Sequence, residues 1–280
     1  MTEDATPSRC AWDAHAGDWL EYSATASGQR RAATFWGHLT PHLDALSDGS
    51  AGVHGRRLQV LDAGCGSGEL GLRLVAAGHR CSFIDLSPQL LASVRQAAAR
   101  MGADALAYCT FYTADLTEIG GLFGPGSVDV IILHSVIEFV PDPPAVLQEL
   151  TALLAPWGLL SVAVSNTWGQ VLKAALEEGD AEKARQALLG DLPLCSRPFG
   201  IEGRSYTPAE ITAVLEQAGL YCEALYGGQI TADYILGRHG HSGPDQAGDW
   251  ADLELALGRQ APFSHIGRMI QVIARRAPSQ

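Results

Sequence analysis

The segment from Val60 to Glu69 carries three alternate glycines directly after a short apolar stretch. Glycine is needed where the backbone takes a positive φ or where a ligand must approach the main chain closely. A strand, a glycine turn and a helix N-terminus together present free N–H groups to a polar or anionic ligand. An ordinary strand-to-helix turn does not require three such glycines. The segment therefore predicts a binding site for a nucleotide-type cofactor.

Three acidic residues help to distinguish the candidate cofactors. The glycines also fit a dinucleotide site, with Asp85 at about the distance expected of a ribose-binding acid. Asp62, however, stands directly before the glycines, where it would repel a pyrophosphate and could hold an ammonium group. Asp115 follows a later apolar stretch, where it could accept from an adenine amino group. We therefore predict S-adenosylmethionine rather than a nicotinamide, with helix capping as the alternative role of Asp62 and Asp115.

His134 and Ser135 directly follow the apolar segment 128–133, and His134 is the best placed candidate for a general base. A hydroxyl or amine acceptor would need such a base, and the ordinary pKa of histidine suits that task. A carboxylate acceptor is already ionised at neutral pH and would need none. The alternative for His134 is a core histidine with satisfied hydrogen bonds.

Strands and helices alternate along most of the chain. The pattern predicts a strand around Val60, four further strands after it, and intervening helices at 69–77, 88–101 and 144–154; the four strands are 80–85, 106–112, 128–133 and 159–164. Such alternation is typical of an α/β protein with a doubly wound, mostly parallel sheet. Strands at 220–226 and 265–275 would bring that sheet to seven. Ligands of these sheets bind outside the carboxyl ends of the strands.

Residues 1–56 are predicted to form an N-terminal helical cap, with helices at 12–20 and 29–46 joined by a loop of small residues, 23–28. Residues 57–280 are predicted to form the catalytic domain. Two segments interrupt its rhythm, 167–206 and 227–262, and both follow strands. We expect them to form helical lid insertions, and the capping box at Thr207–Glu210 to start the helix after the first.

Composition and charge favour a small-molecule partner. The 280 residues have a net charge of −12 and contain only two lysines, whereas nucleic-acid binders usually present a basic face. No apolar run reaches the roughly 20 residues that span a bilayer. The acidic, polar N-terminus and six scattered cysteines indicate a cytoplasmic protein. We expect either a monomer or a homodimer. His239 and His241 lack a third ligand, so no metal site is predicted.

The segments 61–68, 84–87 and 114–116 resemble the successive motifs of class I S-adenosylmethionine-dependent methyltransferases. The resemblance covers residues 57–165. It implies a Rossmann-like fold, S-adenosylmethionine as cofactor and S-adenosylhomocysteine as product. The cofactor-binding residues expected from the acids, the glycines and the resemblance are Arg31, Asp62, Gly64, Cys65, Gly66, Gly68, Asp85, Leu86, Asp115, Leu116, His134 and Ser135.

A narrower resemblance covers nearly the whole chain and links it to the bacterial tRNA carboxymethoxyuridine methyltransferases, which esterify a carboxylate on the wobble uridine. The matching pieces are Gly28-Gln29 with Arg31, 134–143, Asn166, 233–234 and parts of 267–275. It implies that Arg31 approaches the carboxylate of the cofactor. Two departures stand out. The family has a lysine-rich stretch where residues 192–200 carry one basic residue, and Trp157 replaces a usual glycine.

Three functions remain open from the sequence. The first is an O-methyltransferase that acts on a carboxylate, or another oxygen, of a small metabolite. The second is the tRNA carboxyl methyltransferase, and the third is a cofactor-binding protein without transferase activity. An arginine of the lid could pair with an anionic acceptor. The candidate acceptor-binding residues are Asn166, Arg197, Arg204, Tyr206 and Tyr234.

Overall fold

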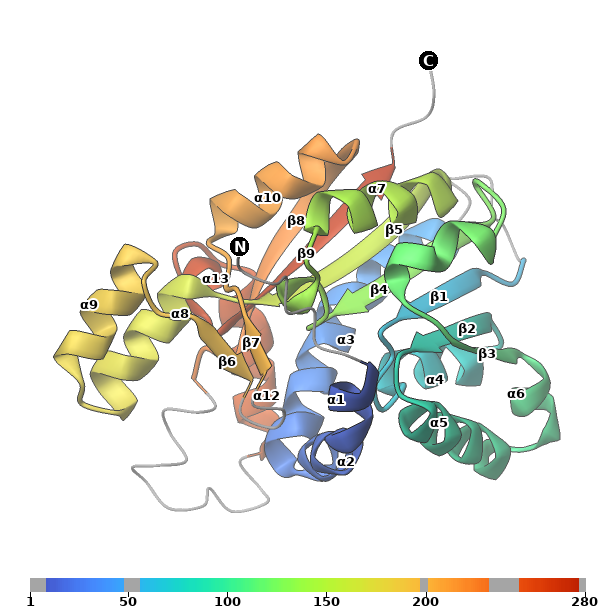
Figure 1. The fold of residues 1–280 in the computed structure, drawn as a ribbon, viewed down its shortest axis with the longest axis horizontal. Coiled ribbons are helices and arrows are strands. Elements are labelled where there is room, and N and C mark those ends of the chain that lie inside the picture. The colour runs from blue at the N-terminus through green and yellow to red at the C-terminus, as the bar shows by residue number, and fades with distance from the viewer. Residues whose placement is uncertain (1–8, 48–55, 197–200, 232–246, 277–280) are drawn as a thin grey trace.

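The computed structural model describes residues 9–47, 56–196, 201–231 and 247–276. A seven-stranded sheet in the order β3-β2-β1-β4-β5-β9-β8 runs through the molecule (Figure 1). The first five strands in that order are parallel, and β9 pairs antiparallel with β5 and β8. The predicted fold class is confirmed. The strands are β1 (Gln59–Ala63), β2 (Arg80–Asp85), β3 (Cys109–Thr113), β4 (Val128–His134), β5 (Leu154–Ser165), β8 (Leu220–Gly228) and β9 (Met269–Arg276).

Helices cover both faces of the sheet, because successive side chains of a strand point to opposite faces. In β4, Ile131 and Leu133 belong to one apolar core, and Val130 and Ile132 to the other. The first core is closed by α7 (Pro143–Leu153) and α10 (Pro208–Gln217). The second is closed by α3 (Ala26–Ser47), α4 (Glu69–Ala76) and α5 (Pro88–Met101). Burial on both faces explains the continuous apolar run of β4.

Local sequence signals start two of the helices, and the predicted capping box is confirmed. The Ser87 side chain accepts from the N–H of Leu90 and caps α5, with Pro88 in the first turn. Thr207 and Glu210 form a reciprocal capping box at α10. Each signal is confined to four residues and acts through backbone geometry, so no distant contact is needed for it to operate.

The predicted loop 23–28 is wrong. Helix α2 (Ala16–Ala24) and α3 are separated by the single residue Thr25. Its hydroxyl donates to the carbonyl of Tyr22 and accepts from the N–H of Gly28, which closes the break between the helices. Alanine has the highest helix propensity, and the small residues of this segment include two alanines. A short helix, α1 (Arg9–Ala14), precedes α2.

Two predicted strands begin later than expected. The prediction for 106–112 included the end of helix α6 (Ala103–Ala107), and β3 starts at Cys109. The prediction for 265–275 included part of helix α13 (Phe263–Ile266). Residues 155–158 lie within β5 and interrupt its register with β4, and Trp157 there has a φ of 64°. That is the left-handed region, where a glycine would be favoured.

The first insertion lies beside the carboxyl end of β5 (Figure 1). It contains α8 (Thr167–Leu172), a π-helical turn (Lys173–Glu177) and α9 (Ala181–Leu189). The predicted helical insertion 167–206 also contains two short antiparallel strands, β6 (Leu194–Ser196) and β7 (Ile201–Gly203). The second insertion contains α12 (Ala247–Gly258). Among the described helices, none combines the length and apolar character required to cross a bilayer. The domain boundaries and the lid role stay predictions.

Candidate active site

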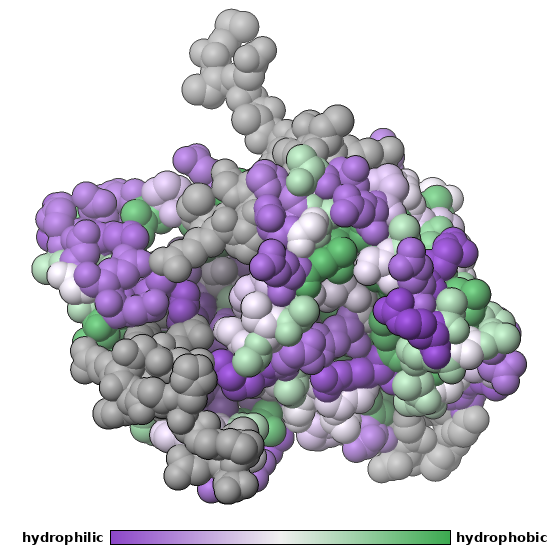
Figure 2. Space-filling view, turned by 90° about the horizontal axis from the view of Figure 1, so that it is seen from below, coloured by the Kyte–Doolittle hydropathy of each residue, from purple (hydrophilic) through white to green (hydrophobic). Residues whose placement is uncertain are grey.

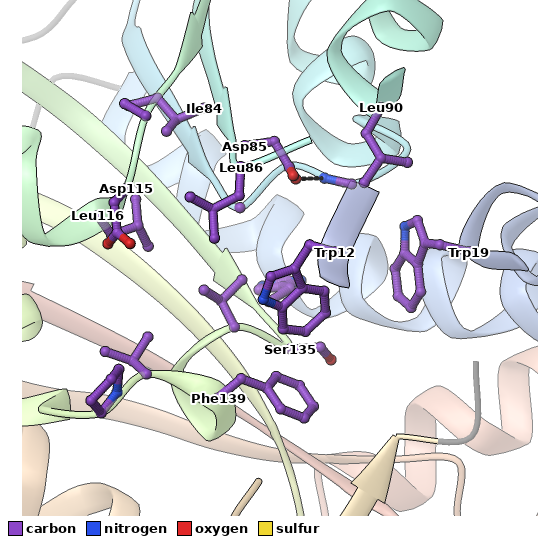
Figure 3. Close-up of a pocket in the computed structure, with 17 residues that line it drawn as sticks. Trp12, Trp19, Ile84, Asp85, Leu86, Leu90, Asp115, Leu116, Ser135 and Phe139 are labelled. Atoms are coloured by element: carbon purple, nitrogen blue, oxygen red, sulfur yellow. Dashed lines mark hydrogen bonds between the residues drawn. The ribbon is translucent and has the colours of Figure 1, made fainter. Parts of the chain in front are cut away.

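A pocket with two adjoining compartments lies where the central strands end, beneath the N-terminal helices. Figure 3 shows the first compartment, with Asp85, Leu86, Asp115 and Leu116 on its strand side and the indoles of Trp12 and Trp19 on its helical side. The second compartment is lined by residues of α2, α3 and the glycine loop. The residues common to both are Trp19, Gly64 and His134.

The glycine loop lets the main chain reach the floor of this pocket. Gly64 has a φ of 70°, and a Cβ placed on it would lie 2.4 Å from Cγ2 of Val136. Gly66 has a φ of 54°, and a Cβ there would lie 2.4 Å from the indole nitrogen of Trp19. Any side chain at either position would be strained and would fill space between the loop and its neighbours. The predicted need for glycine is therefore explained by conformation and by close approach.

Asp62 is buried beneath the loop and joins β1 to α4. Its Oδ2 accepts from the N–H of Gly71 at 3.2 Å, and only 5% of the residue is exposed. Burial, reinforced by the neighbouring Asp85, raises the pKa of Asp62 to about 8, while the Gly71 hydrogen bond opposes that shift. The bond to Gly71 gives Asp62 a structural role. Because Asp62 also lines the second compartment, contact with a cofactor ammonium stays a prediction.

Asp85 and Asp115 both reach the first compartment while accepting hydrogen bonds from the backbone. Asp85 accepts from the N–H of Gly66 at 2.8 Å (dashed in Figure 3) and from the N–H of Ser87 at 2.9 Å. Burial raises its pKa despite these bonds. Asp115 caps a 3₁₀ helix (Leu116–Gly121) by accepting from the N–H of Thr117 at 2.9 Å. The capping alternative therefore holds for Asp115, and its place in the pocket still allows contact with an adenine.

Arg31 meets the end of β4 although 104 residues separate it from Ser135. Its Nη2 donates to the Ser135 hydroxyl at 2.5 Å, and its guanidinium lies 5.5 Å from the ring centres of both Trp19 and Phe35. Ser135 itself has a φ of 56°, which is uncommon for a residue other than glycine. Backbone strain of this kind clusters at functional sites. The structure thus places a cation beside the strained end of a central strand.

His134 is held between the sheet and α3. Its Nε2 lies 2.8 Å from the hydroxyl oxygen of Ser161, and its ring packs edge-on against Phe35 at 5.2 Å. Burial, aided by the positive charge of Arg31, lowers the pKa of His134 to about 3. The imidazole is therefore neutral at physiological pH and a weak base. The general-base role stays a prediction, and this pKa argues against it.

The predicted acceptor-binding residues do not gather at the pocket. Asn166 is fully buried, donates to the carbonyls of His265 and Gly267 at 2.7 Å each, and caps α8. Tyr206 packs in the core, where burial raises its pKa to about 12, and Arg204 lies over its ring. None of these three lines either compartment. Arg197, Tyr234 and the pair His239 and His241 lie outside the described residues.

Sequence reasoning missed several aromatic residues of the pocket. Trp12 and Trp19 sit on helices whose apolar spacing also suits core packing, so only their number in a short segment could have singled them out. Trp12 packs edge-on against Phe139, with ring centres 5.3 Å apart. Asp13 fastens α1 in place by accepting from the Ser87 hydroxyl at 2.5 Å. This side of the pocket is therefore an apolar wall built from segments that are far apart in the sequence.

The residues present fit S-adenosylmethionine. The first compartment combines apolar side chains with two carboxylates, which suits an adenosine group. The second places Arg31 and the open backbone of the glycine loop where the amino acid part would lie. The buried Nδ1 of His134 has no hydrogen-bond partner among the described residues, so a ligand would supply one.

Comparisons with known proteins agree with this fit. Residues 61–162 match a family described as a methyltransferase domain. A putative methyltransferase in complex with the Haloferax volcanii Trm112 activator superposes with a TM-score of 0.60 at 19% identity, over 97% of this chain and 98% of that one. The Burkholderia thailandensis 1,6-didemethyltoxoflavin-N1-methyltransferase, solved with S-adenosylhomocysteine, superposes with a TM-score of 0.55 at 17% identity, over 97% and 91%. These likenesses establish the fold.

Sequence relatives identify the family. The chain belongs to the class I S-adenosylmethionine-dependent methyltransferases, and S-adenosylmethionine is its cofactor. Within that class, it is 30% identical over 264 residues to the tRNA 5-carboxymethoxyuridine methyltransferase of Escherichia coli, which covers 91% of this chain and 92% of the relative. It is also 30% identical over 171 residues to a ubiquinone biosynthesis O-methyltransferase of Xanthomonas euvesicatoria, covering 60% and 65%.

Proposed function

We propose that this enzyme transfers a methyl group to a carboxylate oxygen of a small-molecule acceptor. The observation that carries the proposal is the state of His134. It is the titratable group between the two compartments, and burial beside Arg31 keeps it neutral and weakly basic. An acceptor that must lose a proton would need a better base, whereas a carboxylate is already ionised.

The cofactor supplies an activated methyl group on a sulfonium, so the protein's task is alignment. The glycine loop and Asp85 would fix the adenosine end, and Arg31 the charged end. The apolar wall formed by Trp12 and Phe139 would exclude water and orient the acceptor. Positioning alone can provide effective molarities of about 10⁵–10⁸ M, which suits a displacement without proton transfer.

The surface supports a small acceptor over a nucleic acid. Both lysines of the chain are engaged with Glu178, at 3.3 Å from Lys173 and 2.6 Å from Lys183. Hydrophilic side chains gather at the left of Figure 2, on the side of α8 and α9, and there Arg185 pairs with Glu182. Basic groups held in ion pairs are less available to neutralise phosphates, which supply much of the affinity of nucleic-acid binders.

A tRNA acceptor is the second candidate, and one observation favours it. The relative named for tRNA 5-carboxymethoxyuridine is similar over 91% of this chain, whereas the ubiquinone O-methyltransferase matches 60% of it. Both candidates share the carboxylate chemistry, so they differ in the size and charge of the molecule that carries the carboxylate.

A labelling assay with fractionated cell extract distinguishes a small-molecule acceptor from a tRNA acceptor. The enzyme is incubated with methyl-labelled S-adenosylmethionine and with either purified bulk tRNA or the fraction below about 1 kDa. We expect label in the low-mass fraction and no saturable tRNA binding in a gel-shift assay at physiological salt. Label found only in tRNA would contradict the small-molecule acceptor and favour the tRNA acceptor. Binding of S-adenosylhomocysteine without transfer to either fraction would favour a non-catalytic protein.

A further inference from the structure

A line of buried polar groups runs from the pocket across three neighbouring strands, on the face of the sheet that α3 covers. His134 on β4 contacts the Ser161 hydroxyl on β5 at 2.8 Å. Ser161 in turn accepts from Nε2 of Gln271 on β9 at 3.0 Å, and the same nitrogen donates to the carbonyl of Phe35 at 3.2 Å. Ser161 and Gln271 are both fully buried. Buried polar groups with so few partners constrain where each hydrogen can be.

The carbonyl of Phe35 determines how the Gln271 amide is oriented. A carbonyl oxygen can only accept, so the amide end that faces it must be the NH₂ group. The opposite orientation would place two oxygens against each other. Because the same nitrogen faces Ser161, its second hydrogen is directed at the serine hydroxyl. Ser161 therefore receives a hydrogen bond from Gln271 and keeps its own hydrogen to donate.

The Ser161 hydrogen has a single acceptor among the described residues, and that acceptor is Nε2 of His134. A neutral imidazole that accepts at Nε2 carries its proton on Nδ1. If the proton were on Nε2 instead, both groups would present a hydrogen to the same contact, or the buried hydroxyl hydrogen would be left unpaired. The contacts on three adjacent strands thus select one tautomer of His134.

The protonated Nδ1 belongs to a side chain that lines both compartments. It is buried and lacks a hydrogen-bond partner within the part of the chain that the structure describes. Arg31 lies close by, since it contacts Ser135 and packs on the same Phe35 ring as His134. An N–H donor and a guanidinium at one place repel a cation and attract an anion, and a carboxylate satisfies both.

We propose that Ser161 and Gln271 hold His134 as its Nδ1–H tautomer, so that the neutral imidazole donates to a ligand carboxylate beside Arg31. His134 is then a binding donor rather than a base, and Ser161 and Gln271 are positioning residues. The carboxylate is that of the acceptor or that of the cofactor's amino acid part. The first source rests on the proposed function, and the second does not.

Nitrogen-15 NMR of labelled histidine tests the tautomer directly in the protein without ligand. We expect His134 to show a protonated Nδ1 and an unprotonated Nε2 from pH 5.5 to 8. Ser161→Ala removes the hydrogen bond to Nε2 and should raise the population of the Nε2–H form. Thr151→Ala is the matched control, because it removes another buried hydroxyl, on α7, that bonds to the Leu147 carbonyl at 2.7 Å. A wild-type Nε2–H tautomer would overturn the proposal and leave carboxylate methylation standing.

Substitutions at His134 test the donor. The amide of His134→Asn reaches roughly where Nδ1 lies, and that of His134→Gln reaches toward Nε2. We expect His134→Asn to retain methyl-transfer activity. His134→Gln and His134→Ala should each lose about tenfold in that activity, which is the scale of one hydrogen bond to a charged group. If His134 were a general base, all three variants would lose activity equally. That result would overturn the proposal.

Calorimetry distinguishes the two carboxylates. His134→Ala is titrated with S-adenosylhomocysteine and with 5′-methylthioadenosine, which lacks the amino acid part. Weaker binding of the first ligand alone assigns the carboxylate to the cofactor. If neither ligand weakens but the KM in the low-mass labelling assay rises about tenfold, the carboxylate is that of the acceptor. An equal loss for both ligands, or no change in any of the three measurements, would show that Nδ1 donates to no carboxylate.

Discussion

The two halves of the active site are built in different ways. The cofactor half comes from β1, β2 and the glycine loop, where residues within about two dozen positions of one another hold the pocket through backbone hydrogen bonds. The rest of the site, which includes the apolar wall proposed to face the acceptor, joins α1, α3 and the end of β4, with partners such as Arg31 and Ser135 that are 104 residues apart. A local motif can fix a donor site, whereas the acceptor site depends on how the whole chain packs.

The largest effect is expected in the glycine loop. Gly64→Ala places a Cβ 2.4 Å from the Val136 side chain at a φ of 70°, so the loop or the segment after β4 must shift. We expect the affinity for S-adenosylhomocysteine to fall at least about a hundredfold in calorimetry, because the strain and the displaced pocket floor act together. Gly78→Ala is the matched control. It has a φ of 91° but nothing within 4 Å of the added Cβ, so its cost should appear in stability alone.

Asp85→Ala comes next. It removes the acceptor for the N–H groups of Gly66 and Ser87 and the proposed partner of the ribose. We expect a loss of about 10- to 100-fold in cofactor affinity by calorimetry. Asp129→Ala provides the comparison, since Asp129 is also a buried acid that accepts a backbone N–H, that of Gln59 at 2.8 Å, but lies away from the pocket. Equal losses of cofactor affinity in both variants would contradict the proposal that Asp85 binds the ribose.

Because Asp62 is buried, we expect the free energy of unfolding to depend on pH. Its pKa rises from 3.8 in the unfolded chain to about 8 in the fold, chiefly through burial. Between those values the native state binds the extra proton, so this contribution to stability is complete below pH 4 and is lost as the pH rises through about 8. The slope cannot exceed about 1.4 kcal/mol per pH unit for one proton. Urea unfolding from pH 5 to 8 should show a shallower decline for Asp62→Asn than for the wild type, and parallel curves would contradict this.

The smallest effect on the cofactor is expected in the lid. Arg204 lies over the Tyr206 ring and lines neither compartment. Arg204→Ala should therefore change the affinity for S-adenosylhomocysteine less than about twofold, in line with the small worth of isolated surface charges. If Arg204 binds the acceptor, as the sequence predicts, the KM of the acceptor rises while cofactor affinity stays constant. A fall in cofactor affinity would show that the two halves are coupled.

The features of the site that depend on local sequence are the ones that could be predicted. Glycine conformation, the Ser87 cap and the alternation of strands follow from residues near one another, and all are found in the fold. Asn166 could not be placed, because its side chain bonds to carbonyls about 100 residues away. Trp12 and Trp19 have the spacing of core residues, and only the packing of α1 and α2 against α5 places them at the pocket.

His134 shows the same limit in chemical terms. Its position after an apolar strand was visible in the sequence, and its residue type suggested a base. The lowered pKa, the contact of His134 with Ser161 and the bond from Gln271 to Ser161 involve β5, β9 and α3, which no local pattern reveals. A sequence pattern can therefore locate a functional side chain without determining its protonation.

The central claim is that the enzyme methylates a carboxylate. A methyl ester is hydrolysed by mild alkali and releases volatile methanol, whereas methyl ethers and methylamines survive that treatment. After incubation of the enzyme with methyl-labelled S-adenosylmethionine and the low-mass fraction, we predict that alkali makes most of the transferred label volatile. Label that stays bound to its acceptor after alkali would contradict the claim.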